Sequence, residues 1–437
     1  MKREAMIVAC CNDLAGKTRG KAFPAVQLDK RLKRGVGWTP TNVQITCFDT
    51  IGDSPFGSLG DLVLIPDPDT LVSIESEGDA PPERFVMGNI RHTDGRPWEY
   101  CTRSILEDAL ARLERVAGVS LFSAFEHEFQ FRGAVSAPGQ AFTLAGFRTE
   151  RAFCEGVIAA MRDAGISPDT ILREYGAGQF EVTMNPQKGV TAADHSAITR
   201  EVVTAVAAKL GRVPTFTPIR DPAGVGNGVH IHMSMLDPSG APATWDPNGR
   251  HELSETAGGF VAGILRYLPS ILAITAPSVV SYLRLTPHRW SAAFNNLGFR
   301  DREAAVRICP VSDISDLAKA QQFNFEFRAA DATGSPYLQL AALVHAGVQG
   351  IEEALPVPDA TQDDLSLLDA DTLRERGIVR LPQSLEEALA ALEADPTVRG
   401  WFPHGFVDTY AKHKQAEIAY LAGKDMAAVC AAYEEVY

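Results

Sequence analysis

The sequence predicts an α+β protein in which a small, mostly β domain precedes a larger domain that combines an antiparallel sheet with helices. Short β-like runs separated by Gly and Pro fill the first hundred residues or so, and helical spacing of apolar residues begins near residue 103. Several later segments alternate strictly between apolar and polar residues, which indicates strands with one buried face. The expected domains are residues 1–96 and 97–437.

The amino-acid composition indicates a globular protein and argues against two kinds of partner. The chain has 437 residues, 45% of them hydrophobic and 22% charged, which is ordinary for a globular protein. Its 41 Lys and Arg against 55 Asp and Glu give a net charge of −14, which argues against nucleic acid or an anionic membrane as a partner. The seven cysteines lack CxxC spacing, and we find no targeting signal, so we expect a cytoplasmic protein.

The expected elements follow in chain order. Residues 5–11, 43–48 and 62–65 have the pattern of short strands, and the apolar residues of 105–116 have helical spacing that ends at Gly118. A second helix carries apolar residues from 198 to 210 and ends at Gly211, and residues 384–436 contain several helices. The apolar stretch 258–283 is interrupted by Arg266, Pro269 and Pro277, so we interpret it as a buried helix rather than a membrane span.

The alternating segments share a distinctive polar face. Successive side chains of a strand point to opposite faces, so each segment separates its apolar residues from its polar ones. Glu174 lies just before the Gly-rich turn 176–178 that leads into one of them. The polar faces carry Glu126 and Glu128 in 121–131, Gln179, Glu181 and Thr183 in 179–184, His230, His232 and Ser234 in 229–235, Arg307 in 306–308, and Asn324, Glu326 and Arg328 in 323–328.

Any one of these faces could simply be the solvated side of an antiparallel sheet. Together they favour a metal site, because Glu, His and Arg dominate them and Lys is nearly absent. Five carboxylates gathered at one place would repel one another unless cations were supplied. Oxygen ligands with one imidazole suit Mg²⁺ or Mn²⁺, and two such ions with Arg side chains suit phosphoryl transfer.

The order of these motifs resembles the glutamine synthetase superfamily. The matching stretches are 125–129 (FEHEF), Glu174 to Glu181, 227–234 (NGVHIHMS), Arg302 to Arg307 and Glu326 to Asp331. The resemblance covers almost the whole chain. It implies an α+β fold with a β-grasp domain at 1–96 and a catalytic domain at 97–437, whose antiparallel sheet floor has helices packed on its outer face.

The resemblance also implies a role for each matching residue. It implies ATP and two or more Mg²⁺ or Mn²⁺ ions as cofactors, and catalytic roles for Arg284, Arg302 and Arg328. Other roles stay open for three of these residues: a surface or interface role for Arg284, a structural role for His230 and a plain hydrogen-bonding role for His232. The implied ligands are Glu128, Glu174 and Glu181 for one metal and Glu126, His230 and Glu326 for the second. The residues implied to hold glutamate are Gly226, Arg284 and Arg328. Arg302 and Arg307 are implied to bind phosphate, and His232 and Ser234 to contact the nucleotide.

One departure from the family pattern bears on the substrate. Members that use ammonium place a glutamate six residues beyond the substrate arginine, and counting from Arg284 brings Trp290 to that position. A small cation needs anionic ligands to replace its hydration, whereas an organic amine gains binding energy from an aromatic wall. We therefore expect Trp290 to contact the acceptor of an ATP-dependent ligase that joins the γ-carboxylate of glutamate to an organic amine through γ-glutamyl phosphate.

Three alternatives remain open from the sequence. They are a glutamine synthetase that uses ammonium, a metal-dependent amide hydrolase, and a non-catalytic scaffold that keeps the fold. The family assembles active sites between neighbouring subunits, so the resemblance also implies a homo-oligomer of stacked rings, a dodecamer.

Overall fold

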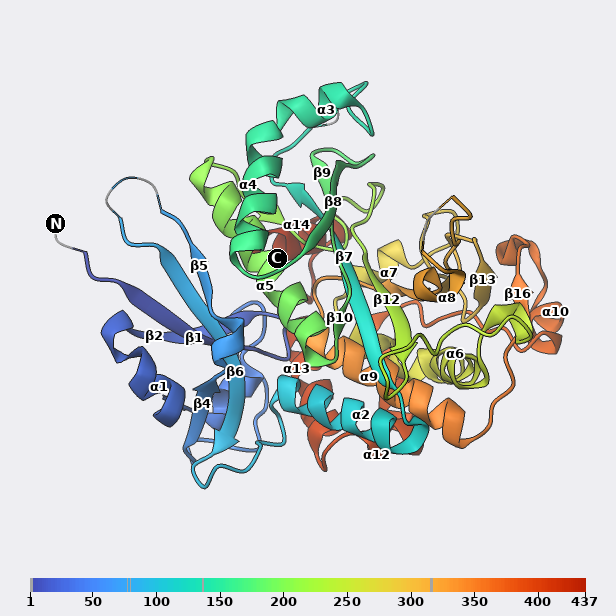
Figure 1. Cartoon of the computed structure of the whole chain (residues 1–437), viewed down its shortest axis with the longest axis horizontal. Coiled ribbons are helices and arrows are strands. Elements are labelled where there is room, and N and C mark those ends of the chain that lie inside the picture. The colour runs from blue at the N-terminus through green and yellow to red at the C-terminus, as the bar shows by residue number, and fades with distance from the viewer. Residues whose placement is uncertain (1–2, 77, 79, 136, 315–316) are drawn as a thin grey trace.

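The N-terminal part of the chain forms a six-stranded sheet in this computed structural model (Figure 1). The structure describes residues 3–76, 78, 80–135, 137–314 and 317–437. The strand order is β2-β1-β6-β4-β3, with β5 also paired to β6, and only the pairing of β1 with β6 is parallel among these strands. The elements are β1 (Met6–Asn12), β2 (Thr18–Pro24), α1 (Leu28–Arg34), β3 (Val36–Trp38), β4 (Leu62–Pro66), β5 (Val72–Ile74) and β6 (Glu83–His92).

Two of the three strands predicted here are confirmed, and the third is wrong. Residues 5–11 and 62–65 correspond to β1 and β4, but residues 43–48 do not form a strand of the sheet. The chain forms a 3-10 helix at Pro40–Gln44 instead. The Gln44 side chain is fully buried and donates a hydrogen bond to the carbonyl of Thr409, 3.0 Å away. This contact with a distant helix outweighs the local β propensity.

The larger part of the chain is built on a ten-stranded sheet. Its order is β16-β13-β14-β15-β12-β7-β9-β8, and β10 and β11 pair with β7. The strands from β14 to β8 are antiparallel, as expected, but β13 runs parallel to both β14 and β16, so that edge makes the sheet mixed. The strands are β7 (Ser120–Phe131), β8 (Pro168–Arg173), β9 (Gln179–Met184), β10 (Gln187–Lys188), β11 (Pro214–Thr215), β12 (Val229–Leu236), β13 (Leu297–Phe299), β14 (Val306–Ile308), β15 (Phe325–Ala330) and β16 (Ala360–Thr361).

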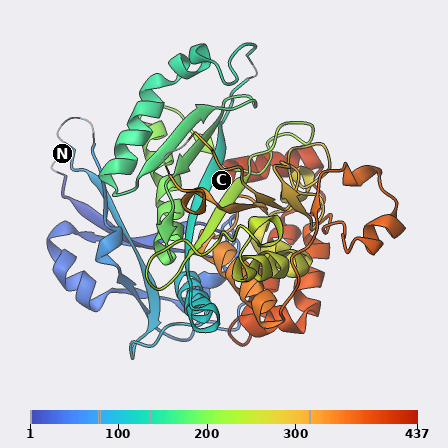
Figure 2. The same ribbon diagram turned by 45° about the vertical axis from the view of Figure 1, so that its right-hand side comes forward.

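Helices cover the apolar face of this sheet. Phe125, Phe129, Phe325 and Phe327 on that face are fully buried, and helices α2, α5 and α6 contact the strands that carry them. Figure 2 shows the segment around α10 projecting away from the small domain. The helices are α2 (Thr102–Ala117), α3 (Leu144–Thr149), α4 (Arg151–Asp163), α5 (Val190–Lys209), α6 (Glu255–Thr275), α7 (Ser281–Arg284), α8 (Lys319–Gln322), α9 (Pro336–Glu352), α10 (Ala370–Glu375), α11 (Leu385–Ala394), α12 (Pro396–Trp401), α13 (Phe406–Leu421) and α14 (Met426–Val436).

Helix α6 is a core helix. It is long and apolar enough to cross a membrane, yet 83% of its most apolar window is buried inside the protein. Its closest partner is α9, and glycines allow the two backbones to approach. A Cβ on Gly263 would lie 2.1 Å from the carbonyl oxygen of Ala346, and a Cβ on Gly350 would lie 2.5 Å from the Cα of Gly263. Side chains larger than hydrogen would therefore separate the helices.

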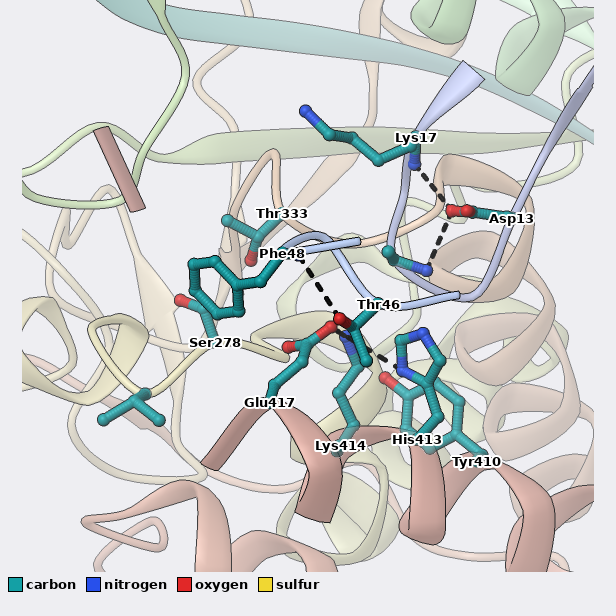
Figure 3. Close-up of polar contacts among 12 residues, drawn as sticks. Asp13, Lys17, Thr46, Phe48, Ser278, Thr333, Tyr410, His413, Lys414 and Glu417 are labelled. Atoms are coloured by element: carbon teal, nitrogen blue, oxygen red, sulfur yellow. Dashed lines mark hydrogen bonds and ion pairs between the residues drawn. The ribbon is translucent and has the colours of Figure 1, made fainter. Parts of the chain in front are cut away.

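Helix α13 joins the small domain to the rest of the chain through buried polar groups (Figure 3). Lys414 Nζ donates to Glu417 Oε1 over 3.0 Å, and both side chains are 1% exposed. His413 Nε2 lies 3.2 Å from the carbonyl oxygen of Ile45. Burial lowers the pKa of His413 well below its ordinary value, and Lys414 adds to that effect. A neutral imidazole can therefore be buried at the domain boundary without an unpaired charge.

Arg103 makes a second buried connection between the two domains. Its guanidinium donates to both carboxylate oxygens of Asp194 over 2.9 Å each. The same group donates to Asn89 Oδ1 over 2.6 Å and to Asp67 Oδ2 over 2.7 Å, both in the small domain. The Tyr337 hydroxyl donates to Asp194 as well, over 2.7 Å. The network satisfies a charge that is almost fully removed from water.

We expect Asp194→Ala to lower the free energy of unfolding by about 3–5 kcal/mol, because it leaves the buried Arg103 with only its outer partners. Denaturant titration and the thermal midpoint measure this loss. Asp371→Asn removes an exposed partner of Arg374 and serves as the control, with an expected loss of under about 1 kcal/mol. Equal losses in the two variants would contradict the role given to Arg103.

Candidate active site

The polar face of the large sheet brings the predicted ligand residues together. The strand register pairs His230 with Glu126 and Glu128 with Glu181, and directly opposed residues share a face. His230 Nδ1 lies 3.0 Å from Glu126 Oε2. The register therefore places carboxylates and an imidazole from separate strands on one face of the sheet.

Two groups of side chains on this face have the spacing of metal ligands. Glu126, Glu181 and His230 place one ligand atom each within 4.8 Å of one another, and His232, Cys309 and Glu326 do the same. The first group differs from the expected assignment, which placed Glu181 with Glu128 and Glu174. Glu128 accepts the amide of Gly228 over 2.8 Å. Glu174, in the loop after β8, accepts the amide of Tyr175 over 2.9 Å.

Cys309 also lies on this face and is not among the predicted site residues. Its Sγ lies 3.7 Å from His232 Nδ1, and its side chain is buried at the end of β14. The signal was available, because Cys309 continues the alternation that places Arg307 on the polar face. His127 behaves as a structural residue, with Nε2 2.8 Å from the hydroxyl of Ser196 on the helix side of the sheet.

The carboxylates of the polar face divide into those whose pKa is raised and those whose pKa is lowered. Burial, reinforced by the neighbouring carboxylates, raises the pKa of Glu181 to about 9. Burial also raises the pKa of Glu174. For Glu126, burial is outweighed by hydrogen bonds with His230 and His232, which hold its pKa well below the ordinary range.

Glu326 is the carboxylate with the strongest cationic surroundings. Its burial would raise its pKa, but the contact with His232 and the charges of His230 and Arg328 lower it. Arg328 donates to Glu326 over 2.5 Å, and Arg307 Nε lies 3.1 Å from the same oxygen. His232 Nε2 lies 3.0 Å from the other oxygen.

The side chains fit divalent cations. Carboxylate oxygens with one imidazole are a donor set for Mg²⁺ or Mn²⁺. Burial first, and then the charges of neighbouring carboxylates, raise the pKa of Glu181, so its ionised form is disfavoured in the absence of a cation. A cation would balance these charges, so Glu126, Glu181 and His230 are the residues best placed to hold a metal, with Glu128, Glu174 and Glu326 nearby.

The residues expected to hold glutamate lie at one end of this face. Arg284 is 4% exposed, so it is not a surface residue; it donates to Ser291 Oγ over 2.8 Å and to the carbonyl of Ala330 over 2.5 Å. A Cβ on Gly226 would lie 2.7 Å from Arg284 Cγ, which explains a glycine there. Arg328 Nε donates to the carbonyl of Arg302 over 3.0 Å.

The residues expected to bind ATP are less closely grouped. Arg307 is buried beside Glu326, and His232 Nδ1 lies 2.9 Å from Asn324 Oδ1. Ser234 lies two residues further along the same face of β12 and is partly exposed, and the Arg302 side chain is exposed beside β14. The structure therefore brings His232 and Arg307 together and leaves Arg302 and Ser234 towards solvent.

Trp290 lies in a loop that we call the flap, residues 286–291. Its side chain is 72% exposed, and its carbonyl accepts a hydrogen bond from Arg328 over 3.3 Å. The flap therefore lies next to the expected glutamate site. Glu303 contacts the flap backbone and was also missed, because a carboxylate that binds main-chain amides has no pattern in the sequence.

The raised pKa of Glu181 predicts a pH-dependent effect of metal. Without metal the folded protein retains this proton up to about pH 9, whereas the unfolded chain loses it near 4.5. The stability that it contributes is present below about pH 4.5 and is lost as pH rises towards 9. We expect the thermal midpoint of chelated protein to fall over this range, and Mn²⁺ to raise it more at about pH 8.5 than at about pH 6.

Glu181→Gln provides the matched comparison. It removes the titrating carboxyl and one ligand, so the thermal midpoint should depend less on pH and respond less to Mn²⁺. Identical pH slopes for the two proteins would mean that Glu181 titrates normally.

Comparisons with known proteins identify the family of the chain. The model of the glutamine synthetase N-terminal domain matches residues 2–98, and that of the glutamine synthetase catalytic domain matches residues 99–428. Gamma-glutamylpolyamine synthetase GlnA3 of Streptomyces coelicolor is 33% identical over 446 residues, covering 99% of this chain and 93% of that protein.

Solved structures are similar over the same length. A crystal structure described as a novel glutamine synthase homolog has a TM-score of 0.91 and 40% identity, covering 100% of this chain and 99% of that one. The GmaS/ADP complex has a TM-score of 0.81 and 26% identity, covering 96% and 94%. The β-strand register, the acidic polar face and these matches lead to one conclusion: the chain belongs to the glutamine synthetase family.

Proposed function

We propose that this protein is an ATP-dependent ligase that joins the γ-carboxylate of glutamate to an organic amine. In this reaction the γ-carboxylate attacks the γ-phosphorus of ATP, which releases ADP and gives γ-glutamyl phosphate. The amine nitrogen then attacks the acyl carbon and phosphate leaves, which gives the amide after loss of a proton. The family membership supports the ligase chemistry.

The chain's own residues have distinct parts in this proposal. Arg284 and Arg328 are buried beside the flap and would orient the glutamate carboxylate and the reacting acyl group. Arg302 and Arg307 would neutralise charge on the transferred phosphoryl group. When bound, divalent ions would screen the phosphate oxygens from the carboxylates of the sheet.

The flap is the feature that supports an organic amine as the acceptor. Trp290 presents an exposed indole where ammonium-using members of the family carry a carboxylate. Glu303, the nearby carboxylate, accepts one main-chain amide of the flap with each oxygen, so the flap backbone sets its orientation. An aromatic surface contributes more to the binding of an alkyl ammonium ion than to that of ammonium.

A cavity lies beside the loop to which Arg289 anchors the flap. The cavity, of about 620 Å³, is lined by Tyr175, Asp221, Gly224 and Val225, among others, and Arg289 of the flap donates to the carbonyl of Gly224. Similarity to a gamma-glutamylpolyamine synthetase also supports an organic acceptor. These features favour an amine with a chain of several atoms.

Three further properties belong to this proposal. The oxygen-rich ligand set favours Mg²⁺ or Mn²⁺ as the ions. The seven cysteines are free and buried, which is consistent with a reducing cytoplasm. A ring assembly is supported by the family and by exposed apolar side chains in the small domain, including Val26 and Leu59.

An amine screen tests the acceptor. With ATP, glutamate and Mg²⁺, we expect methylamine, ethanolamine, putrescine or spermidine to give a kcat/KM at least about tenfold above that of ammonium, because the flap offers an aromatic wall and no acid. Phosphate release and mass spectrometry of the amide measure this. If ammonium gives the highest kcat/KM, the protein is a glutamine synthetase and the proposal fails.

Trp290→Glu is the matched variant for this screen. It restores a carboxylate to the flap, so the ratio of kcat/KM for ammonium to that for the best organic amine should rise by roughly tenfold. An unchanged ratio would show that Trp290 does not face the acceptor.

Light scattering tests the assembly. We expect a mass of about twelve chains, because site residues are shared between neighbouring subunits in the proposed stacked rings. A monomer with full activity would exclude the shared site.

A further inference from the structure

The flap has a backbone conformation that its own residues do not favour. His288 and Trp290 have φ angles of +63° and +54°, in the left-handed region that bulky side chains rarely adopt. Both side chains are exposed, so burial does not enforce this conformation; the His288 imidazole contacts the Ser366 hydroxyl over 3.2 Å. Such strain persists when the surrounding structure over-determines the backbone, and it is concentrated at functional sites.

Glu303 supplies one of the contacts that hold the flap. The amide of Trp290 donates to Glu303 Oε1 over 3.1 Å, and the amide of His288 donates to Oε2 over 3.2 Å. A single carboxylate thus binds the amides of both strained residues. Glu303 is fixed in turn, since its own amide donates to Asp301 Oδ1 over 2.9 Å.

Arg289 holds the flap from the other side. Its guanidinium donates to the carbonyl of Gly224 over 2.9 Å and to that of Pro222 over 3.0 Å. The side chain between the two strained residues therefore connects the flap to the loop that lines the 620 Å³ cavity. Arg328 binds the carbonyl of Trp290, and Arg284 binds Ser291.

We infer that Glu303 is a positioning residue that, together with Arg289, fixes the flap and so sets the preference for organic amines over ammonium. This inference rests on the proposed function. A flap held in one conformation presents the Trp290 indole as a preorganised wall, and binding an amine then does not require ordering of the loop. Glu303 also follows Arg302 directly, so the contact connects the acceptor side of the site to the phosphate side.

The role differs from that of a catalytic base. Each oxygen of Glu303 accepts one hydrogen bond from a main-chain amide of the flap, so the carboxylate is oriented towards the flap backbone. Loss of Glu303 should therefore alter how the amine binds rather than the formation of γ-glutamyl phosphate. Kinetics with separate amines can distinguish these roles.

The test compares Glu303→Ala, Glu303→Asp and Arg289→Met with the full-length wild type. Hydrogen exchange of the flap peptide should be roughly tenfold faster or more in Glu303→Ala and Arg289→Met, because the amides lose their acceptor or the loop loses its anchor. The KM for the organic amines of the screen should rise by roughly tenfold, with the KM for ATP and glutamate within about twofold. Glu303→Asp retains a carboxylate and should recover part of both effects.

Glu155→Gln is the control, because Glu155 is an exposed partner of Arg151 on helix α4. It should leave exchange and kinetics unchanged. Unchanged flap exchange in Glu303→Ala would overturn the contact, and faster exchange with an unchanged amine KM would overturn the positioning role. A loss of kcat alone, equal for every amine and for ammonium, would identify a base instead.

The exchange measurement also separates this inference from the proposed function. It needs no turnover, so it reports the Glu303 contact even for a protein that ligates no organic amine. If the wild type ligates no organic amine, the proposed function is wrong, and so is the amine preference assigned to Glu303. If only the Glu303 and Arg289 variants behave like the wild type, the inference about Glu303 is wrong and the proposed function stands.

Discussion

The accumulation of negative charge on one face of the large sheet is the constraint on which the active site depends. The apolar faces of the strands are buried under helices, so the fold itself forces Glu126, Glu128, Glu181 and Glu326 onto the opposite face. Histidines and arginines compensate part of this charge, but Glu181 retains a strongly raised pKa. Burial and neighbouring carboxylates thus disfavour the ionised form of Glu181, and a cation bound there would favour it.

Arg328 connects this charged face to the acceptor side. One side chain contacts the Glu326 carboxylate, the carbonyl of Arg302 and the carbonyl of Trp290. Because a guanidinium presents its donors in a rigid plane, these three partners have a fixed relative geometry. One residue that is 3% exposed thus contacts a carboxylate of the polar face, the backbone at Arg302 and the flap.

Much of this arrangement follows from the sequence. Strict alternation predicts which side chains share the polar face, because the period of a strand leaves only two faces. The pattern could not predict contacts between distant segments, such as that of Gln44 with Thr409, where a 3-10 helix replaces part of the expected strand. Nor could it reveal Glu303, whose partners are main-chain amides and so leave no trace in residue types. The parallel pairing of β13 was missed because three-residue strands carry too little alternation to show direction.

The Arg103 network has a consequence for how the two domains can change over time. Asn89 and Asp67 come from the small domain, whereas Arg103 and Asp194 come from the catalytic part. Recombination between residues 89 and 103 would separate the two halves of a buried network. Natural or engineered chimaeras between relatives should thus fold only where both parents carry compatible partners at these four positions. The two domains are therefore expected to be inherited together.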